Sequence, residues 1–149
     1  MNLHKVSDSD IMSEYNRRFE IPLGDVISSS DDTARHLRPL YNEDRDIEQF
    51  YIVFLNARNA IISTKLMFRG SLMSSSVHIR EIIKECLKQE AAAVILSHNH
   101  PSGNNNPSGN DRSITKEIVK ACKVMGITVH DHIIICREKF YSFADEGRI

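Results

Sequence analysis

The chain has 149 residues, of which 41% are hydrophobic and 26% charged, a balance that fits one globular domain with a real core. Its formal net charge of −1 gives no overall basic footprint for nucleic acid, although it leaves room for a local basic patch. No apolar run approaches the roughly 18 residues of a membrane span, and the first ten residues lack the apolar core of a signal peptide. The three cysteines are far apart within apolar patterns, which favours buried free thiols and a cytoplasmic location.

The first half of the chain predicts two short helices followed by a hairpin. Residues 7–19 carry apolar side chains at four-residue intervals, and residues 31–39 fit a second helix with Ser30 as its N-cap. A charged connector, YNEDRDIE, comes next. Residues 49–55 and 60–68 are then expected to be two strands joined by a short turn.

The second half predicts helices that alternate with strands. Residues 77–89 form an amphipathic helix, and the following AAAVIL segment reads as a strand buried on both faces. Residues 111–126 form another helix, followed by strands at 127–136 and 139–143. The helix stripes expected to be buried are Ile79, Ile82, Ile83, Cys86 and Leu87 in the first helix, and Ile114, Ile118, Cys122 and Met125 in the second. This order predicts an α/β fold, with a mixed β-sheet flanked by helices.

The segment SHNHPSGNNNPSGND, residues 97–111, stands out because it follows the most hydrophobic strand directly. The carboxyl ends of strands in open α/β sheets are where ligands bind. His98 and His100 are two residues apart on an extended chain, so their side chains point the same way and can bind one ion. Asp111 enters from the start of the next helix. Two imidazoles and one carboxylate leave a fourth position open, as in catalytic zinc sites, where a bound water has a pKa of about 7.

The same segment also has a purely structural interpretation. Ser108 and Asp111 have the spacing of a capping box, which would start the following helix without any metal. The prolines and the Gly-Asn pairs are ordinary loop formers. Alternating histidines on a strand can also be structural, so the spacing alone leaves both interpretations open.

The whole segment resembles a known motif. Its pattern of His-x-His, seven residues, Ser, two residues and Asp is similar to the JAMM motif of the JAB/MPN metalloprotease family, and HNHPSG followed by PS and D resembles the RadC branch. The similarity extends over SSDDTARHLRPLY, EQFYIVFLNARN, FRGSL, VHIREI and DHIII. It implies a RadC-like JAB/MPN domain with a cytidine-deaminase-like architecture at residues 30–149, preceded by an N-terminal helical extension at residues 1–29.

The resemblance implies specific roles for these residues. His98, His100 and Asp111 would hold one Zn²⁺ per chain, and Ser108 would donate a hydrogen bond to the oxyanion. The family also requires an upstream glutamate as general base. We assign this role to Glu48.

Glu48 is the only acidic residue between Asp46 and Glu81, and it stands just before the first core strand. Glu43 and Asp46, in the same connector, are the alternatives for the general base. The alternative without a catalytic role is that Glu48 is one of several acids on a solvated loop.

Several other polar residues have weaker claims to a function. Ser97 could hydrogen-bond near the metal, and Asn99 should have a structural or substrate-side role because it points away from the histidines. His130 and His132 could support the site, form a second metal pair, or be ordinary strand histidines. Arg69 could line a cleft.

The leading hypothesis is a zinc-dependent metallohydrolase that acts on peptide or isopeptide bonds of a peptide or protein substrate. The alternative is a DNA-repair-associated or partner-binding JAB module with little intrinsic catalysis. Longer RadC-type proteins carry a helix-hairpin-helix segment, and the residues before Glu48 lack paired hairpin glycines, which weakens a direct DNA role. A zinc deaminase would need His-x-Glu and Pro-Cys-x-x-Cys, and neither motif is present. A two-metal nuclease would need more carboxylates than the single one, Asp111, that this segment offers. Exposed sheet edges would allow a homodimer.

Overall fold

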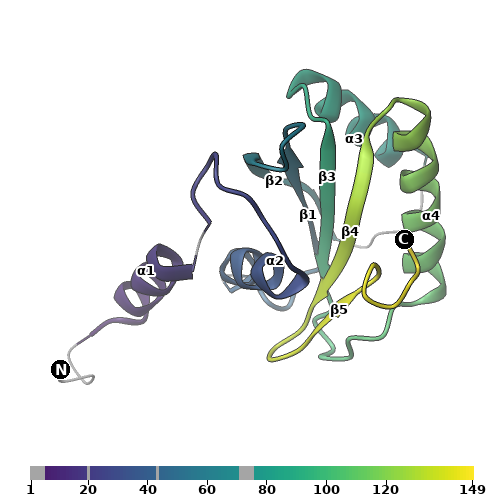
Figure 1. The fold of residues 1–149 in the computed structure, drawn as a ribbon. Helices are drawn as coiled ribbons and strands as arrows, with labels where there is room; N and C mark the ends of the chain where they lie inside the picture. The colour runs from purple at the N-terminus through teal and green to yellow at the C-terminus, as the bar shows by residue number, and fades with distance from the viewer. Residues whose placement is uncertain (1–5, 20, 43, 71–75) are drawn as a thin grey trace.

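A five-stranded mixed sheet forms the centre of the molecule (Figure 1). The computed structural model describes residues 6–19, 21–42, 44–70 and 76–149. The strand order is β2-β1-β3-β4-β5, where β3 and β4 are parallel and the other neighbours antiparallel. The strands are β1 Gln49–Leu55, β2 Ile61–Arg69, β3 Ala93–Asn99, β4 Thr128–Ile135 and β5 Phe140–Ser142. The predicted α/β fold is confirmed.

Helices cover both faces of this sheet, and α1 lies at the periphery (Figure 1). The helices are α1 Asp8–Phe19, α2 Ser30–Leu37 with its 3₁₀ continuation η2 Arg38–Tyr41, α3 Ser76–Lys88 and α4 Gly109–Val124. Side chains of α3 and α4 form one core with Phe50, Phe54 and Leu96 of the sheet. Side chains of α2 and η2 form a second core on the opposite face with Val53, Ile95 and their neighbours. Successive side chains of β1 point to opposite faces of the sheet, so they contribute alternately to the two cores.

Three local predictions from the sequence are wrong. The N-cap of α2 is Ser29, whose backbone is extended and whose hydroxyl accepts from the Asp32 amide at 3.1 Å, whereas Ser30 is already helical. Leu87 is 52% exposed, because it lies about 80° around α3 from Ile79, at the edge of the apolar stripe.

The third wrong prediction is the burial of Met125, which is 45% exposed. The helix α4 ends at Val124, and Met125 is its C-cap with a non-helical backbone, so its side chain does not continue the apolar stripe. Gly126 follows with a φ of +72°, which is the left-handed conformation that a residue after a helix end commonly adopts.

The three cysteines, Cys86, Cys122 and Cys136, are buried and free, as the sequence predicts. Among the described residues, no helix is long and apolar enough to cross a membrane. The cytoplasmic location, the homodimer and the boundary near residue 30 stay predictions.

Candidate metal centre

Strand pairing brings the upstream acid to the two histidines. β1 and β3 are antiparallel, with Phe50 opposite His98, so the start of β1 lies beside the end of β3. Glu48 precedes β1 by one residue, and His100 follows β3 by one residue. Residues that are 50 or more positions apart in the sequence therefore meet at one edge of the sheet, which is where the carboxyl ends of β3 and β4 also lie.

Asp111 reaches the same edge from the first turn of α4. Ser108 is the N-cap of this helix, and the capping box is complete: the Ser108 hydroxyl accepts from the Asp111 amide at 3.0 Å, and Asp111 Oδ2 accepts from the Ser108 amide at 2.8 Å. The structural interpretation of the segment is thus correct. It is also compatible with a metal, because the cap holds the carboxylate in one orientation.

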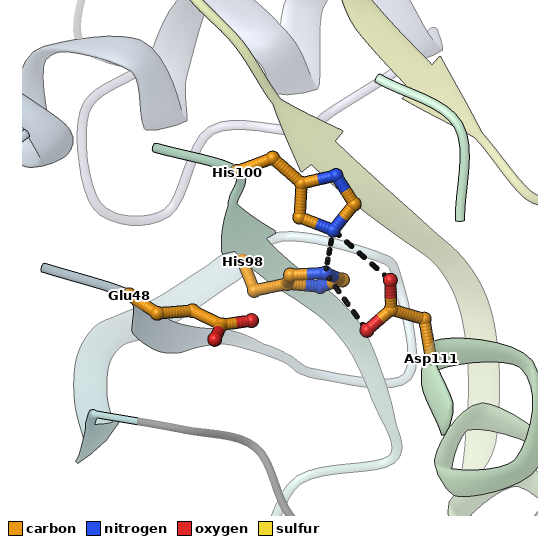
Figure 2. A group of neighbouring side chains, drawn as sticks. All are labelled: Glu48, His98, His100 and Asp111. Atoms are coloured by element: carbon orange, nitrogen blue, oxygen red, sulfur yellow. Dashed lines mark hydrogen bonds and ion pairs between the residues drawn. The ribbon is translucent and has the colours of Figure 1, made fainter. Parts of the chain in front are cut away.

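Glu48, His98, His100 and Asp111 form one cluster, in which one potential ligand atom from each lies within 4.8 Å of the others. Figure 2 shows their side chains directed toward a common point. The Nε2 atoms of His98 and His100 are 3.0 Å apart. Asp111 Oδ1 lies 3.3 Å from His98 Nε2, and Asp111 Oδ2 lies 3.0 Å from His100 Nε2. This cluster is a candidate metal site.

A hydrogen bond at Nδ1 of His100 determines whether Nε2, the nitrogen that faces the cluster, carries a hydrogen. His100 Nδ1 lies 2.6 Å from the carbonyl oxygen of Asn104, which can only accept, so Nδ1 carries a hydrogen. A neutral His100 therefore presents the lone pair of Nε2 to the cluster.

A longer chain of hydrogen bonds fixes His98 in the same way. The Thr115 hydroxyl donates its single hydrogen to the Asp111 carbonyl at 2.6 Å, so it must accept from His132 Nδ1, also at 2.6 Å. His132 Nε2 then accepts from His98 Nδ1 at 2.7 Å. Burial is the main cause that lowers the pKa of His132 well below its ordinary value, which keeps this ring neutral. His98 is left with a lone pair on Nε2.

Two imidazole lone pairs and a carboxylate therefore converge at one point, where they would repel one another without a positive charge between them. When no ion is bound, a proton on the histidine Nε2 atoms is the other source of positive charge, and the pKa values of Asp111 and His100 reflect it. Burial alone would raise the pKa of Asp111, but hydrogen bonds with His100 and His98 hold it well below its ordinary value. The hydrogen bond with Asp111 raises the pKa of His100. The donor set fits a divalent metal that accepts nitrogen and oxygen ligands.

Asn99 anchors the strand end that carries Glu48. Its Oδ1 accepts from the Gln49 amide at 2.7 Å, and its Nδ2 donates to the Ile47 carbonyl at 3.0 Å. The Glu48 carbonyl accepts from the Gly70 amide at 2.8 Å. Both neighbours of Glu48 and its own backbone are thus fixed, while the half-buried carboxylate points toward the histidines (Figure 2).

The cluster opens into a surface hollow of about 390 Å³. Glu48, His100, Ser108 and Asp111 line it together with the loop at residues 101–106. The Ser108 hydroxyl accepts one hydrogen bond, and within the described residues its own hydrogen has no acceptor. That hydrogen is available to a ligand in the hollow.

The RadC-like JAB domain family matches residues 27–148. The chain belongs to this family. A UPF0758 protein of Thiobacillus denitrificans is 44% identical over 130 residues, which cover 87% of this chain and 58% of that protein. UPF0758 protein plu4865 of Photorhabdus laumondii is 38% identical over 100% of this chain and 66% of its own length. UPF0758 protein YfjY of Escherichia coli is 41% identical, over 82% of this chain and 76% of that protein.

The chain thus spans less than two thirds of the first two relatives. The resemblance to the RadC-like JAB family is confirmed, and the individual roles of the site residues stay predictions.

Three of the remaining polar candidates of this RadC-like JAB domain have structural partners, and the two alternative acids are not placed in the cluster. Ser97 is buried and accepts from the Tyr41 hydroxyl at 2.8 Å. Asn99 has the structural role described above. Asp46 is exposed and is not part of the cluster, and Glu43 lies outside the described residues. Arg69 pairs with Asp44 at 2.9 Å.

His130 and His132 do not form a second metal pair. The register between β3 and β4 slips by one residue at His130, since Val94 pairs with Val129 and Ile95 with Asp131. A slip of one residue changes the face on which a side chain lies. His130 is exposed and bonds Asn59, whereas His132 supports the site.

Two supporting residues of this JAB domain were missed from the sequence, Thr115 and Asn104. Thr115 is four residues after Asp111 in α4 and therefore lies on the same helix face, which is a signal that could have found it. Asn104 acts through its backbone carbonyl, for which the side-chain pattern gives no signal.

The hydrogen-bond chain behind His98 predicts that Thr115→Val weakens metal binding. Valine has nearly the same shape but can neither accept from His132 nor donate to Asp111. Losing such an outer partner typically costs 10- to 100-fold in metal affinity, and we expect a loss of that size in competition with a chelating dye for zinc. Thr128→Val, at an exposed threonine of β4, is the matched control. Equal zinc affinity in the two variants would show that the chain does not fix His98.

Proposed function

We propose that this chain is a zinc-dependent hydrolase of peptide or isopeptide bonds. The observation that supports the proposal most strongly is the convergence of the His98 and His100 lone pairs on the carboxylate of Asp111. Beside them lies the carboxylate of Glu48, which has no hydrogen bond or ion pair within the described residues. Two imidazoles and one carboxylate are a ligand set typical of catalytic zinc, with room for a water or substrate. We expect one Zn²⁺ per chain.

Zinc bound by His98, His100 and Asp111 would lower the pKa of a coordinated water to about 7 and polarise the substrate carbonyl. Glu48 would act as the general base. Its carboxylate, held at the cluster by the anchored start of β1, would take a proton from the attacking water and deliver it to the leaving amine nitrogen. The bond that breaks is the amide C–N bond, and the water oxygen forms the new bond to the carbonyl carbon.

Ser108 would stabilise the oxyanion that develops on the carbonyl oxygen. Its hydroxyl accepts from the Asp111 amide, which leaves the hydroxyl hydrogen free to be donated into the hollow. A preorganised donor of this kind is worth more at the tetrahedral stage than in the ground state.

The test is metal-dependent hydrolysis by the full chain. A panel of peptide substrates and lysine-linked isopeptide substrates is incubated with zinc-loaded protein, with the same protein after chelation, and after zinc is returned. We expect hydrolysis that is lost on chelation and recovered with zinc. Hydrolysis that is indifferent to chelation would contradict the proposal. If zinc binds but no substrate in the panel is cleaved, the partner-binding JAB module becomes the better account.

A further inference from the structure

A second cavity adjoins the candidate metal centre. It has a volume of about 210 Å³ and shares His100 and Pro101 with the hollow above the cluster. Tyr41, Ile135 and Cys136 are buried and contribute to its lining. A polypeptide lying across His100 would therefore place one bond at the metal centre and a neighbouring group in this cavity.

Positive charge dominates the wall of this cavity. Its lining residues include three arginines, Arg38, Arg45 and Arg137, and a single acidic residue, Asp46. The lining thus includes three cationic residues and one anionic residue, although the chain as a whole has a net charge of −1.

The three arginines differ in how far their donors are already used. Arg38 Nη1 donates to the carbonyls of Cys136 and Arg137, each at 2.6 Å, and so fixes the turn between β4 and β5. Within the part of the chain that the structure describes, Arg45 donates through one nitrogen only, to Asn42 Oδ1 at 3.0 Å. Within the described ranges, the Arg137 side chain has no hydrogen-bond or ion-pair partner. Arg45 and Arg137 therefore have donors available to a ligand.

We propose that this cavity is a subsite for a carboxylate of the substrate, either an acidic side chain beside the scissile bond or a C-terminal carboxylate. The planar guanidinium fork matches a carboxylate in two parallel hydrogen bonds. This position relative to a scissile bond rests on the proposed hydrolase function. The binding of a carboxylate does not, and it can be measured by itself.

A nucleic-acid backbone fits these observations less well. Affinity for nucleic acid arises from several phosphates neutralised along a basic surface. Here only two guanidinium groups are open, Asp46 is among the lining residues, and the cavity is small. A single carboxylate uses both arginines without requiring further cations.

The experiment follows the arginine side-chain Nε–H signals of the full chain by NMR. Acetyl-glutamate amide and acetyl-glycine probe the two sources of carboxylate, and acetyl-glutamine amide and acetyl-glycine amide are their neutral counterparts. We expect the carboxylates, and not the amides, to shift the Arg45 and Arg137 signals in a saturable way. Comparing the two carboxylates then distinguishes a side chain from a chain end.

Arg45→Gln and Arg137→Gln should each weaken this binding about tenfold, as expected for the loss of a charge-assisted pair. Arg80→Gln, at an exposed position of α3, should leave it unchanged. No saturable shift, or equal shifts with the neutral amides, would overturn the subsite. A 12-nucleotide DNA that shifts the same signals at far lower concentration would also overturn it, and would assign the cavity to phosphates.

The outcomes separate the subsite from the hydrolase. Carboxylate binding in a protein that cleaves no substrate would leave the subsite standing and reject the hydrolase. Zinc-dependent hydrolysis with no carboxylate binding would reject the subsite alone.

Discussion

Glu48→Gln is expected to reduce the rate of hydrolysis by about 10²- to 10⁴-fold while zinc stays bound, because glutamine keeps the shape of the side chain but cannot accept a proton. The structure explains why the substitution should lower the rate of hydrolysis without releasing zinc. Asn99 and Gly70 hold the backbone around Glu48, so the substitution should not move the strand. The three other members of the cluster would still hold the metal. The measurement is kcat on a cleaved peptide or isopeptide, beside zinc content.

Two controls make this result specific. Glu81→Gln changes an exposed acid of α3 and should retain full activity and zinc. Asp46→Asn changes the one alternative general base that lies within the described residues. A loss of the expected size in Asp46→Asn, and not in Glu48→Gln, would reassign the general base. Full activity in all three variants would exclude both Glu48 and Asp46 as the general base.

Much of the fold could be predicted because apolar periodicity is a local property. β1 reads QFYIVFL and is nearly all apolar, which is what a central strand buried on both faces requires. The start of α4 could also be predicted, because Ser108 and Asp111 form a capping box from side chains three residues apart. Where such a local pattern was ambiguous, as at Ser28, Ser29 and Ser30, the prediction missed by one residue.

The cluster itself could be predicted only in part. His98, His100 and Asp111 lie on one short segment, so their spacing carries the information. Glu48 joins them through the antiparallel pairing of β1 with β3, which a single sequence does not show. Its assignment required the family resemblance together with its position just before a strand.

The support around the cluster was beyond the sequence because it depends on tertiary contacts. The slip at His130 decides which of two alternating histidines reaches the site, and nothing in VHDHIII marks it. Likewise, Phe50 and Phe143 pack against the His132 ring, with ring centroids 5.7 and 4.9 Å away. These contacts keep water from the ring and so keep it neutral.

The arginine-lined cavity has the same origin. Arg38, Arg45 and Arg137 come from η2, the following connector and the turn after β4, and they meet only because those segments flank one edge of the sheet. The near-neutral net charge gave no sign of it. A local basic patch, which composition left open, is present beside the candidate metal centre.

The central claim is that His98, His100 and Asp111 hold one metal ion, and elemental analysis of untagged protein tests it most directly. The wild type is offered zinc, freed of excess and compared with a His98→Ala/His100→Ala variant, with His100→Ala alone in case the fully buried His98 is needed for folding. His130→Ala, at an exposed histidine, is the matched control. We predict close to one zinc per chain in the wild type and the control, and almost none in the two site variants while they remain folded. Wild-type protein without zinc, or site variants that retain it, would contradict the account.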